Sequence, residues 1–251
     1  FIISALPERQ TMNQLYLEHF KKIVNPSEIS DKVKFSIDAG NGVLGAIIDD
    51  LSKTFNLNFE GLYMDVDGNF PNHPADPSDE NNLLDLKDKV ISQNLDFGVA
   101  FDGDADRSVF IDDKGNLISG SLMTCLISDW LFEKKSEIKV VHNVNVQPSV
   151  VKYLNDKGIK TIRSKVGHSY IKKIMRDKDA DFGGEHSAHF YLRENFYADS
   201  GILTLLIFLK ILSEKNIKSS ELVQNYNFKP SSGEINYIVQ DVERSLKKIE
   251  N

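Results

Sequence analysis

Val33-Lys34-Phe35-Ser36-Ile37-Asp38 is an apolar strand pattern, and the glycine-rich turn Ala39-Gly40-Asn41-Gly42 follows it directly. Over residues 43–53 the apolar positions recur at helical spacing, and residues 57–63 return to a strand pattern. A strand, a helix and a second strand in this order predict parallel strands joined by a right-handed crossover. This stretch therefore decides the fold class, which is α/β.

The same order of elements recurs later in the chain, so the sequence contains an internal duplication. The second copy has a strand over residues 138–142, a turn that ends in Gln147-Pro148-Ser149, a helix through Leu154 and a strand over residues 159–162. In open α/β sheets the loops at the carboxyl ends of such strands form the ligand site. We therefore predict two tandem, internally duplicated α/β domains with mainly parallel mixed sheets, followed by the start of a further domain.

After a further helix, each copy continues with nearly the same four residues, Leu95-Asp96-Phe97-Gly98 and Ala180-Asp181-Phe182-Gly183. Residues 226–233 have the composition of a linker, and the pattern of a strand and a helix follows them. The predicted divisions are residues 1–10 as the end of a preceding domain or a linker, 11–118 as one domain, 119–229 as the next, and 230–251 as a linker and the start of another.

The composition agrees with a soluble enzyme and argues against several other classes of protein. With 251 residues, of which 41% are hydrophobic, the chain is long enough to bury a sizeable core. A net charge of −7 without a basic run argues against nucleic acid and anionic membranes as partners. Cys125 is the only cysteine, so no disulfide forms within the chain, which suits a cytoplasmic location. The longest apolar run, residues 202–209, is too short to cross a bilayer and predicts a buried helix.

Asp102-Gly103-Asp104-Ala105-Asp106-Arg107 places three carboxylates at alternate positions on a turn between two strand patterns. Such a turn can simply be solvated. Oxygen-only ligands instead favour Mg²⁺ or Ca²⁺ over zinc, and three carboxylates leave positions open for a phosphate, which Arg107 would also bind. An EF-hand loop is excluded, because its sixth position should be glycine and is Arg107, and its twelfth should be glutamate and is Asp113.

The second polar loop is Gly183-Gly184-Glu185-His186-Ser187-Ala188-His189, in which Glu185, Ser187 and His189 alternate. We expect these three side chains to project from one side of an extended segment. Carboxylate and hydroxyl groups can bind sugar hydroxyls, and imidazole can bind a hydroxyl or a phosphate. The alternative is a hydrophilic edge strand without a ligand.

Together these two loops resemble the α-D-phosphohexomutase superfamily, most of all the bacterial phosphomannomutase/phosphoglucomutase family. The resemblance extends over nearly the whole chain. The further motifs that carry it are Asp38-Ala39-Gly40-Asn41-Gly42, Gly68-Asn69-Phe70-Pro71-Asn72-His73-Pro74, Lys165-Val166-Gly167-His168-Ser169 and Tyr197-Ala198-Asp199-Ser200-Gly201. One departure is Asn145, because many family members carry a basic residue at this position.

The resemblance implies a Mg²⁺-dependent isomerase that moves a phosphoryl group between the 1 and 6 positions of mannose or glucose phosphate, through a phosphoserine and a 1,6-bisphosphate. The expected partners are the hexose phosphate and the hexose 1,6-bisphosphate. The implied site residues are Asp102, Asp104 and Asp106 for Mg²⁺, Arg107, Lys165 and His168 for phosphate and catalysis, and Glu185, Ser187 and His189 for the sugar.

Two motifs of that family do not occur in this sequence. They are the Thr-Ala-Ser-His-Asn-Pro-like loop that carries the phosphoserine and an Arg-x-Ser-x-Thr-x-Pro phosphate-binding loop. We therefore expect the chain to be the two central domains of a four-domain mutase, with the N- and C-terminal domains as partners, and to be inactive alone. The general acid and base are not assignable from this chain.

Other functions are compatible with parts of the sequence. A phosphoglucosamine mutase and a non-catalytic module that binds Mg²⁺ and sugar phosphate would share both polar loops. Gly40-Asn41-Gly42-Val43-Leu44-Gly45 satisfies the G-x-G-x-x-G pattern, and Glu60 follows about where a ribose-binding acid would lie. A dinucleotide-binding dehydrogenase is therefore a remote alternative. The other explanation of the pattern is that these glycines only shape the turn. His73 could line the cleft or fix its loop, and Trp130 is expected in the core.

Overall fold

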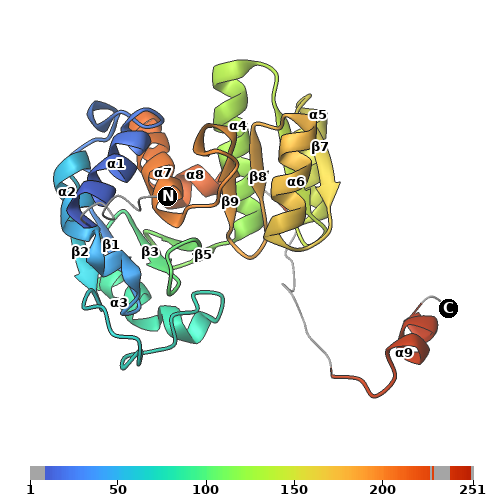
Figure 1. Cartoon of the computed structure of the whole chain (residues 1–251), viewed down its shortest axis with the longest axis horizontal. Coiled ribbons are helices and arrows are strands. Elements are labelled where there is room, and N and C mark those ends of the chain that lie inside the picture. Colours follow the sequence, from blue (N-terminus) through green and yellow to red (C-terminus); the bar gives the residue numbers. More distant parts are fainter. Residues whose placement is uncertain (1–8, 227, 229–237, 250–251) are drawn as a thin grey trace, which may run out of the picture.

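The computed structural model describes residues 9–226, 228 and 238–249, which form two α/β lobes and a final short helix (Figure 1). The strands are β1 (Phe35–Asp38), β2 (Phe59–Leu62), β3 (Phe97–Phe101), β4 (Ser108–Asp112), β5 (Leu117–Ile118), β6 (Lys139–Asn143), β7 (Lys160–Ser164), β8 (Phe182–Gly184) and β9 (Phe190–Leu192). The first sheet has the strand order β2-β1-β3-β4-β5, and the second has the order β7-β6-β8-β9. The α-helices are α1 (Arg9–Lys21), α2 (Ile48–Phe55), α3 (Leu84–Ser92), α4 (Gly120–Lys135), α5 (Pro148–Asp156), α6 (His168–Lys178), α7 (Gly201–Lys215), α8 (Ser219–Gln224) and α9 (Val242–Ile249). Short 3₁₀ helices lie at Pro26–Glu28, Val43–Ala46, Glu80–Leu83 and Arg193–Asn195.

The two sheets are built in the same way. β1 pairs in parallel with β2 and β3, and β6 pairs in parallel with β7 and β8. Antiparallel strands then extend one side of each sheet, β4 and β5 in the first lobe and β9 in the second. The strand order is therefore repeated, and the predicted α/β fold with an internal duplication is confirmed.

An aspartate at the start of the third strand of each copy fixes that strand to the first one. The carboxylate of Asp96 accepts a hydrogen bond from the amide of Lys34 at 2.9 Å, and Asp181 accepts one from the amide of Lys139 at 2.9 Å. The amides of Asp96 and Asp181 donate back to the carbonyls of the same lysines, at 2.7 and 2.9 Å. The repeated four-residue segments in the sequence thus have one structural cause, the register between these two strands.

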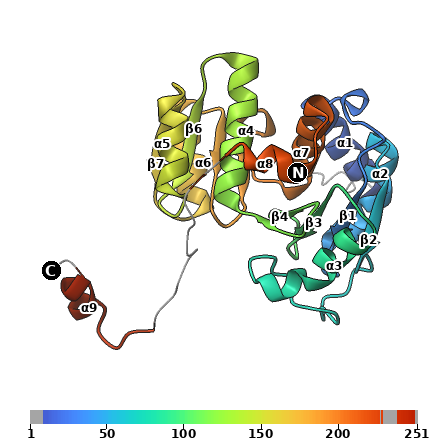
Figure 2. The same cartoon turned by 180° about the vertical axis from the view of Figure 1, so that it is seen from behind.

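The two lobes share one hydrophobic core. α7 follows the second sheet along the chain but packs against the first, where the ring centroid of Phe208 lies 5.0 Å from that of Phe97 and 4.8 Å from that of Phe110. α4 packs on α5 and β8 of the second lobe, and α8 lies between α4 and α7 (Figure 2). The predicted buried helix over residues 202–209 is confirmed, because every one of these residues is buried in α7.

Some element boundaries differ from the expected ones. The pattern over residues 43–53 forms a 3₁₀ helix before α2 begins at Ile48, and the following strand shortens to β2. α9 is the helix expected near the end of the chain, whereas the expected strand before it falls mostly outside the described residues, as do residues 1–8. The boundary between domains 11–118 and 119–229 stays a prediction. In the part of the chain that the structure describes, no helix is long and apolar enough to span a membrane.

Candidate active site

The Asp loop, residues 102–107, is a tight turn between β3 and β4, as its sequence predicts. The amide of Ala105 donates to the carbonyl of Asp102 at 3.1 Å, and Ala105 has a positive φ of 60°. Asp102 is only 3% exposed, Asp106 is half-buried and Asp104 is exposed. One oxygen from each of the three carboxylates lies within 4.8 Å of the other two. This donor set fits a hard divalent cation such as Mg²⁺.

Arg107 closes the Asp loop onto its first carboxylate. The amide of Arg107 donates to Oδ1 of Asp102 at 3.1 Å, its Nε donates to Oδ2 at 2.7 Å, and its Nη1 donates to Asp76 at 3.3 Å. Burial raises the pKa of Asp102, although Arg107 opposes this shift. Burial also disfavours the charge on Arg107, but the surrounding carboxylates outweigh it and raise the pKa of the guanidinium. Because a guanidinium carries five N–H donors, the contacts with Asp102 and Asp76 leave other donors of Arg107 for a phosphate.

Residues 185–189 form a hairpin turn, so the expectation of an extended segment is wrong. β8 and β9 are antiparallel neighbours, and the chain must reverse between them. The amide of Glu185 therefore donates across the turn to the carbonyl of His189 at 3.0 Å. Glu185 is 2% exposed, His189 is half-buried and Ser187 is exposed, so the three side chains lie at different depths. They still lie close together, since Nδ1 of His189 is 3.3 Å from Oγ of Ser187 and 3.8 Å from Oε1 of Glu185.

Two buried side chains hold the carboxylate of Glu185. Its Oε1 accepts a hydrogen bond from the hydroxyl of Tyr191, and its Oε2 accepts one from Nδ2 of Asn143 at 2.8 Å. Burial and then the Glu185 carboxylate raise the pKa of Tyr191. Neither partner was among the site residues expected from the sequence. Asn143 ends β6 as Asp38 ends β1, so the duplication is the signal that could have drawn attention to it.

His189 joins this turn to the Asp loop. Its Nε2 lies 3.4 Å from Oδ1 of Asp106, and the backbones of His189 and Arg107 form an isolated antiparallel bridge. Burial lowers the pKa of His189, but the hydrogen bond with Asp106 and the nearby carboxylates outweigh burial, so the pKa is raised. The same contact lowers the pKa of Asp106. The two polar loops, which come from different lobes, therefore meet in one site.

Asp199 is a further residue of this site that was not among the expected site residues. A carboxylate oxygen of Asp199 lies within 4.8 Å of ligand atoms of both Asp106 and His189. Asp199 also forms an ion pair with Lys172 at 2.7 Å. The sequence shows Asp199 in the family-like motif before α7, but it does not show that Asp199 lies next to the Asp loop, almost a hundred residues earlier.

Lys165 and His168 lie beyond the carboxyl end of β7, whose last residue, Ser164, pairs with Asn143 of β6. Lys165 is in the loop after β7, and His168 is the first residue of α6. Both are exposed, and Nζ of Lys165 lies 5.9 Å from the ring centroid of Tyr170. Within the described ranges, no hydrogen bond or ion pair joins either residue to the Asp loop or to the 185–189 turn. These two predicted site residues therefore lie at the same edge of the second sheet as Asn143 and Glu185, but outside the direct contacts of the cluster.

The glycine-rich turn packs beneath the Asp loop. The amide of Val43 donates to the carbonyl of Gly103 at 2.9 Å, so this N–H group is already bonded within the protein. A Cβ atom on Gly45 would lie 1.8 Å from the carbonyl oxygen of Met64, and only glycine avoids this clash. In a dinucleotide-binding protein the pyrophosphate would sit at the N-terminus of the helix that follows the turn. These contacts favour a structural role for the glycines, which shape the turn, over a role in binding a dinucleotide.

The other two ambiguous residues have structural partners. Nε2 of His73 lies 3.1 Å from Oδ2 of the buried Asp38, so His73 fixes its own loop to the end of β1. Trp130 is buried as expected, and its Nε1 donates to Glu214 at 2.9 Å.

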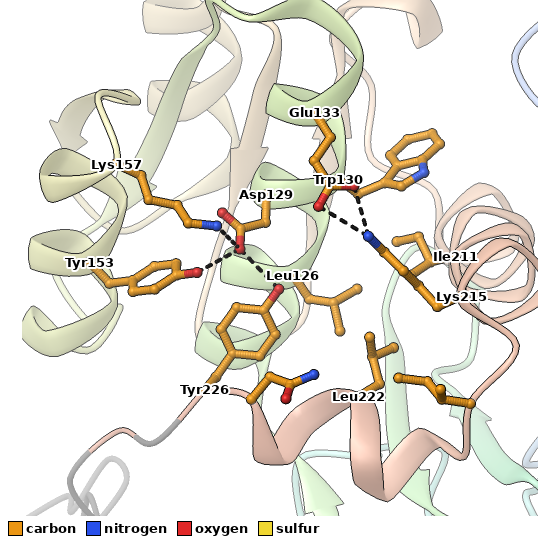
Figure 3. Close-up of a pocket in the computed structure, with 12 residues that line it drawn as sticks. Leu126, Asp129, Trp130, Glu133, Tyr153, Lys157, Ile211, Lys215, Leu222 and Tyr226 are labelled. Atoms are coloured by element: carbon orange, nitrogen blue, oxygen red, sulfur yellow. Dashed lines mark hydrogen bonds and ion pairs between the residues drawn. The ribbon is translucent and has the colours of Figure 1, made fainter.

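A cavity of about 220 Å³ lies beside Trp130, between α4, α5, α7 and α8 (Figure 3). Its charged groups pair with one another, Lys157 with Asp129 at 2.8 Å and Lys215 with Glu133 at 2.8 Å. No residue of the Asp loop or of the 185–189 turn is among the residues that line it. This cavity is therefore separate from the candidate site.

The sequence and the fold of this chain were compared with those of known proteins. Residues 14–115 match the family model "Phosphoglucomutase/phosphomannomutase, alpha/beta/alpha domain II", and residues 119–227 match the corresponding domain III model. A protein of Xanthomonas campestris pv. campestris (strain B100) described as "Phosphohexose mutases" is 34% identical over 247 residues, which cover 98% of this chain and 55% of that protein. The chain thus spans about half the length of the curated relatives it matches.

Solved structures agree with this match. A phosphoglucomutase/phosphomannomutase family protein from Burkholderia thailandensis superimposes with a TM-score of 0.80 at 28% identity, covering 86% of this chain and 47% of that chain. N-acetylphosphoglucosamine mutase from Aspergillus fumigatus, solved in complex with GlcNAc-6P and magnesium, has the same fold, with a TM-score of 0.68 at 16% identity over 86% of this chain and 54% of that chain. Since two domain models match in their family order and together extend over most of the described residues, the chain belongs to the phosphoglucomutase/phosphomannomutase family.

Proposed function

We propose that this chain is the Mg²⁺- and sugar-binding part of a hexose-phosphate mutase. The whole enzyme moves a phosphoryl group between the 1 and 6 positions of glucose or mannose phosphate, through a phosphoserine and a 1,6-bisphosphate. The observation that carries the proposal is the 3.4 Å contact between His189 and Asp106, which brings an acidic loop and a turn with sugar-binding side chains into one site. A mutase needs both functions side by side, because the sugar must present its oxygen to the transferring phosphate.

The Asp loop is proposed to act on the phosphate. Asp102, Asp104 and Asp106 would hold Mg²⁺, which supplies charge neutralisation at the phosphate oxygens when it is bound. Arg107 is anchored by Asp102 and Asp76, so its free N–H groups can bind a phosphate without losing much conformational entropy.

The 185–189 turn is proposed to bind the sugar. Glu185 accepts hydrogen bonds from hydroxyl groups, while Ser187 and His189 lie closer to the surface and can donate or accept. Because Glu185 is 2% exposed, the sugar would meet one edge of its carboxylate. Lys165 and His168 make no direct contact with this cluster among the described residues, and we propose that they meet a phosphate of the bound substrate.

The magnesium and GlcNAc-6P in the Aspergillus fumigatus structure support a metal and a sugar phosphate as the ligand classes of this fold. The phosphoserine and a further phosphate-binding loop would come from the flanking domains of the whole protein, since the relatives are about twice as long as this chain. A phosphoglucosamine mutase and a non-catalytic binding module are the alternatives that the same site could serve.

The test is an assay of the full-length protein with Mg²⁺ and catalytic glucose 1,6-bisphosphate. Glucose 1-phosphate, mannose 1-phosphate and glucosamine 1-phosphate are supplied in parallel, and formation of each 6-phosphate is followed. We expect turnover of the glucose or mannose phosphate that stops with EDTA and returns with Mg²⁺. Faster turnover of glucosamine 1-phosphate would favour the first alternative. Binding of sugar phosphate without turnover of any of the three would favour the second.

A further inference from the structure

The carboxylate of Glu185 is the most completely enclosed charged group of the candidate site. Only 2% of the residue is exposed, and each of its carboxylate oxygens accepts one hydrogen bond from a buried side chain. Water has little access to a charge in this position, so internal donors must replace most of its hydration. From this geometry we propose that Tyr191 and Asn143 are positioning residues that hold Glu185 for substrate binding, an inference that rests on the proposed sugar-binding role of Glu185.

Tyr191 supplies one of the two donors. It lies in β9, the strand that follows the 185–189 turn, and its ring is fully buried. The packing of this ring against Val141, Ile171 and Met175 fixes where its hydroxyl points. The hydroxyl donates to Oε1 of Glu185, so the position of that oxygen is set by the rigid part of the sheet and not by the turn.

Asn143 supplies the other donor, and the internal duplication shows why an amide is required there. In the first lobe, Oδ1 of Asp38 accepts a hydrogen bond from the amide of Gly40 at 2.8 Å. In the second lobe, Oδ1 of Asn143 accepts the equivalent bond from the amide of Asn145 at 3.2 Å. Asp and Asn serve this turn equally well, but only Asn has an NH₂ group that can donate to Glu185.

The two internal bonds also limit what Glu185 can do. A carboxylate offers about four lone-pair sites on its two oxygens. Tyr191 and Asn143 occupy one site on each oxygen, which leaves one on each oxygen for a substrate hydroxyl. The pair therefore sets both the position and the number of the hydroxyl contacts, and the ligand chemistry that fits is two neighbouring hydroxyls of a sugar.

The experiment uses the full-length protein, four single variants and one double variant. Tyr191→Phe removes one donor and keeps the ring. Asn143→Asp removes the other donor and keeps the acceptor that the turn needs. Tyr197→Phe is the matched control, because the hydroxyl of Tyr197 donates to Asp179 and not to Glu185. Glu185→Ala provides a background that has no carboxylate to hold.

We expect Tyr191→Phe to lower kcat/KM for the hexose 1-phosphate about tenfold, Asn143→Asp to lower it at least as much, and Tyr197→Phe to leave it unchanged. The Mg²⁺ concentration for half-maximal activity should not change in any of the three. In the Glu185→Ala background, adding Tyr191→Phe should change kcat/KM less than twofold, because a residue that acts only through Glu185 has no effect without it.

Three results would overturn the inference. A tenfold effect of Tyr191→Phe that persists in the Glu185→Ala background would mean that Tyr191 acts on the fold in general. Wild-type kinetics for both Tyr191→Phe and Asn143→Asp, with Glu185→Ala impaired, would reject positioning while leaving the proposed function intact. Full activity of Glu185→Ala would reject the sugar-binding role itself and the inference with it. If Asn143→Asp does not fold, as judged by thermal unfolding, the inference is decided by the effect of Tyr191→Phe measured with and without Glu185→Ala.

Discussion

Nε2 of His189 lies 3.4 Å from Oδ1 of Asp106, and this contact joins a turn of the second lobe to a loop of the first. The backbone bridge between His189 and Arg107 fixes the same junction, and the amide of Gly201 donates to the carbonyl of Ala105 at 3.1 Å beside it. A Cβ atom on Gly201 would lie 2.7 Å from the carbonyl oxygen of Arg107, so α7 can begin this close to the Asp loop only with glycine. The relative position of the two polar loops is therefore built into the backbone.

Asp104→Asn in the full-length protein should remove most of the mutase activity and leave the fold intact. Asp104 is the exposed member of the three carboxylates, so its change costs no buried contact, but it removes one of the three anionic ligands proposed for Mg²⁺. The checks are turnover as a function of Mg²⁺ concentration and the thermal unfolding midpoint.

Asp88→Asn is the matched control for that variant, because Asp88 is an exposed aspartate of α3 outside the site. It should behave as wild type in both measurements. Unchanged turnover of the Asp104 variant at limiting Mg²⁺ would contradict the metal assignment.

Glu185→Gln should lower kcat/KM for the hexose 1-phosphate by roughly tenfold or more, since a hydrogen bond to a charged acceptor is worth about 1.5–3 kcal/mol. An amide has one acceptor and one donor end, and its donor end would face either the NH₂ group of Asn143 or the hydroxyl of Tyr191. The half-maximal Mg²⁺ concentration should stay constant. The roles of the two loops would have to be exchanged if Mg²⁺ activation weakened while substrate affinity stayed constant.

The fold was largely predictable from the sequence because its signals are local. The repeated strand and helix patterns gave the two sheets, and the aspartates of the four-residue repeats are explained by bonds to the lysines at the starts of the first strands. The apolar run in α7 predicted a buried helix, but its pattern says nothing about which sheet covers it. Phe208 packs on the first sheet although the second one precedes it in the chain.

The candidate site was less predictable because its contacts are long-range. The Asp loop is contiguous, so its three carboxylates were visible together. The alternation in residues 185–189 suggested a strand, but the antiparallel pairing of β8 with β9 demands a turn there. The bond from Asn143 to Glu185 spans 42 positions, and no local pattern predicts it.

Phe208→Ala should destabilise the folded chain by about 3–5 kcal/mol, because removing a fully buried ring from the contact between α7 and the first sheet leaves a cavity there. The free energy of unfolding is measured by denaturant titration. Phe196→Ala is the matched control, since Phe196 is 74% exposed, and it should change the free energy of unfolding by no more than about 0.5 kcal/mol. Equal losses for the two variants would mean that α7 does not pack as described.

Cys125 should be unreactive in the folded protein. Its side chain is fully buried in α4, and burial followed by the nearby Asp129 carboxylate raises the pKa of its thiol, so little thiolate forms near neutral pH. Titration with a chromogenic disulfide reagent should detect no fast-reacting thiol in native buffer and one per chain in denaturant, because Cys125 is the only cysteine. Rapid native reaction would show that the packing around α4 opens readily.

The 251-residue chain, purified alone, should fold and bind Mg²⁺ weakly but show no mutase activity. Folding is expected because one large hydrophobic core extends over both lobes, and 251 residues are ample for a self-sufficient core. Weak binding is expected because three carboxylates and water must satisfy an ion that sheds water reluctantly, without the phosphate that would complete its coordination. Circular dichroism, Mg²⁺ titration calorimetry and the 6-phosphate assay check the three parts. Sustained turnover above a no-enzyme control would mean that the chain contains its own phosphoryl carrier, and the proposal that the flanking domains supply it would have to be abandoned.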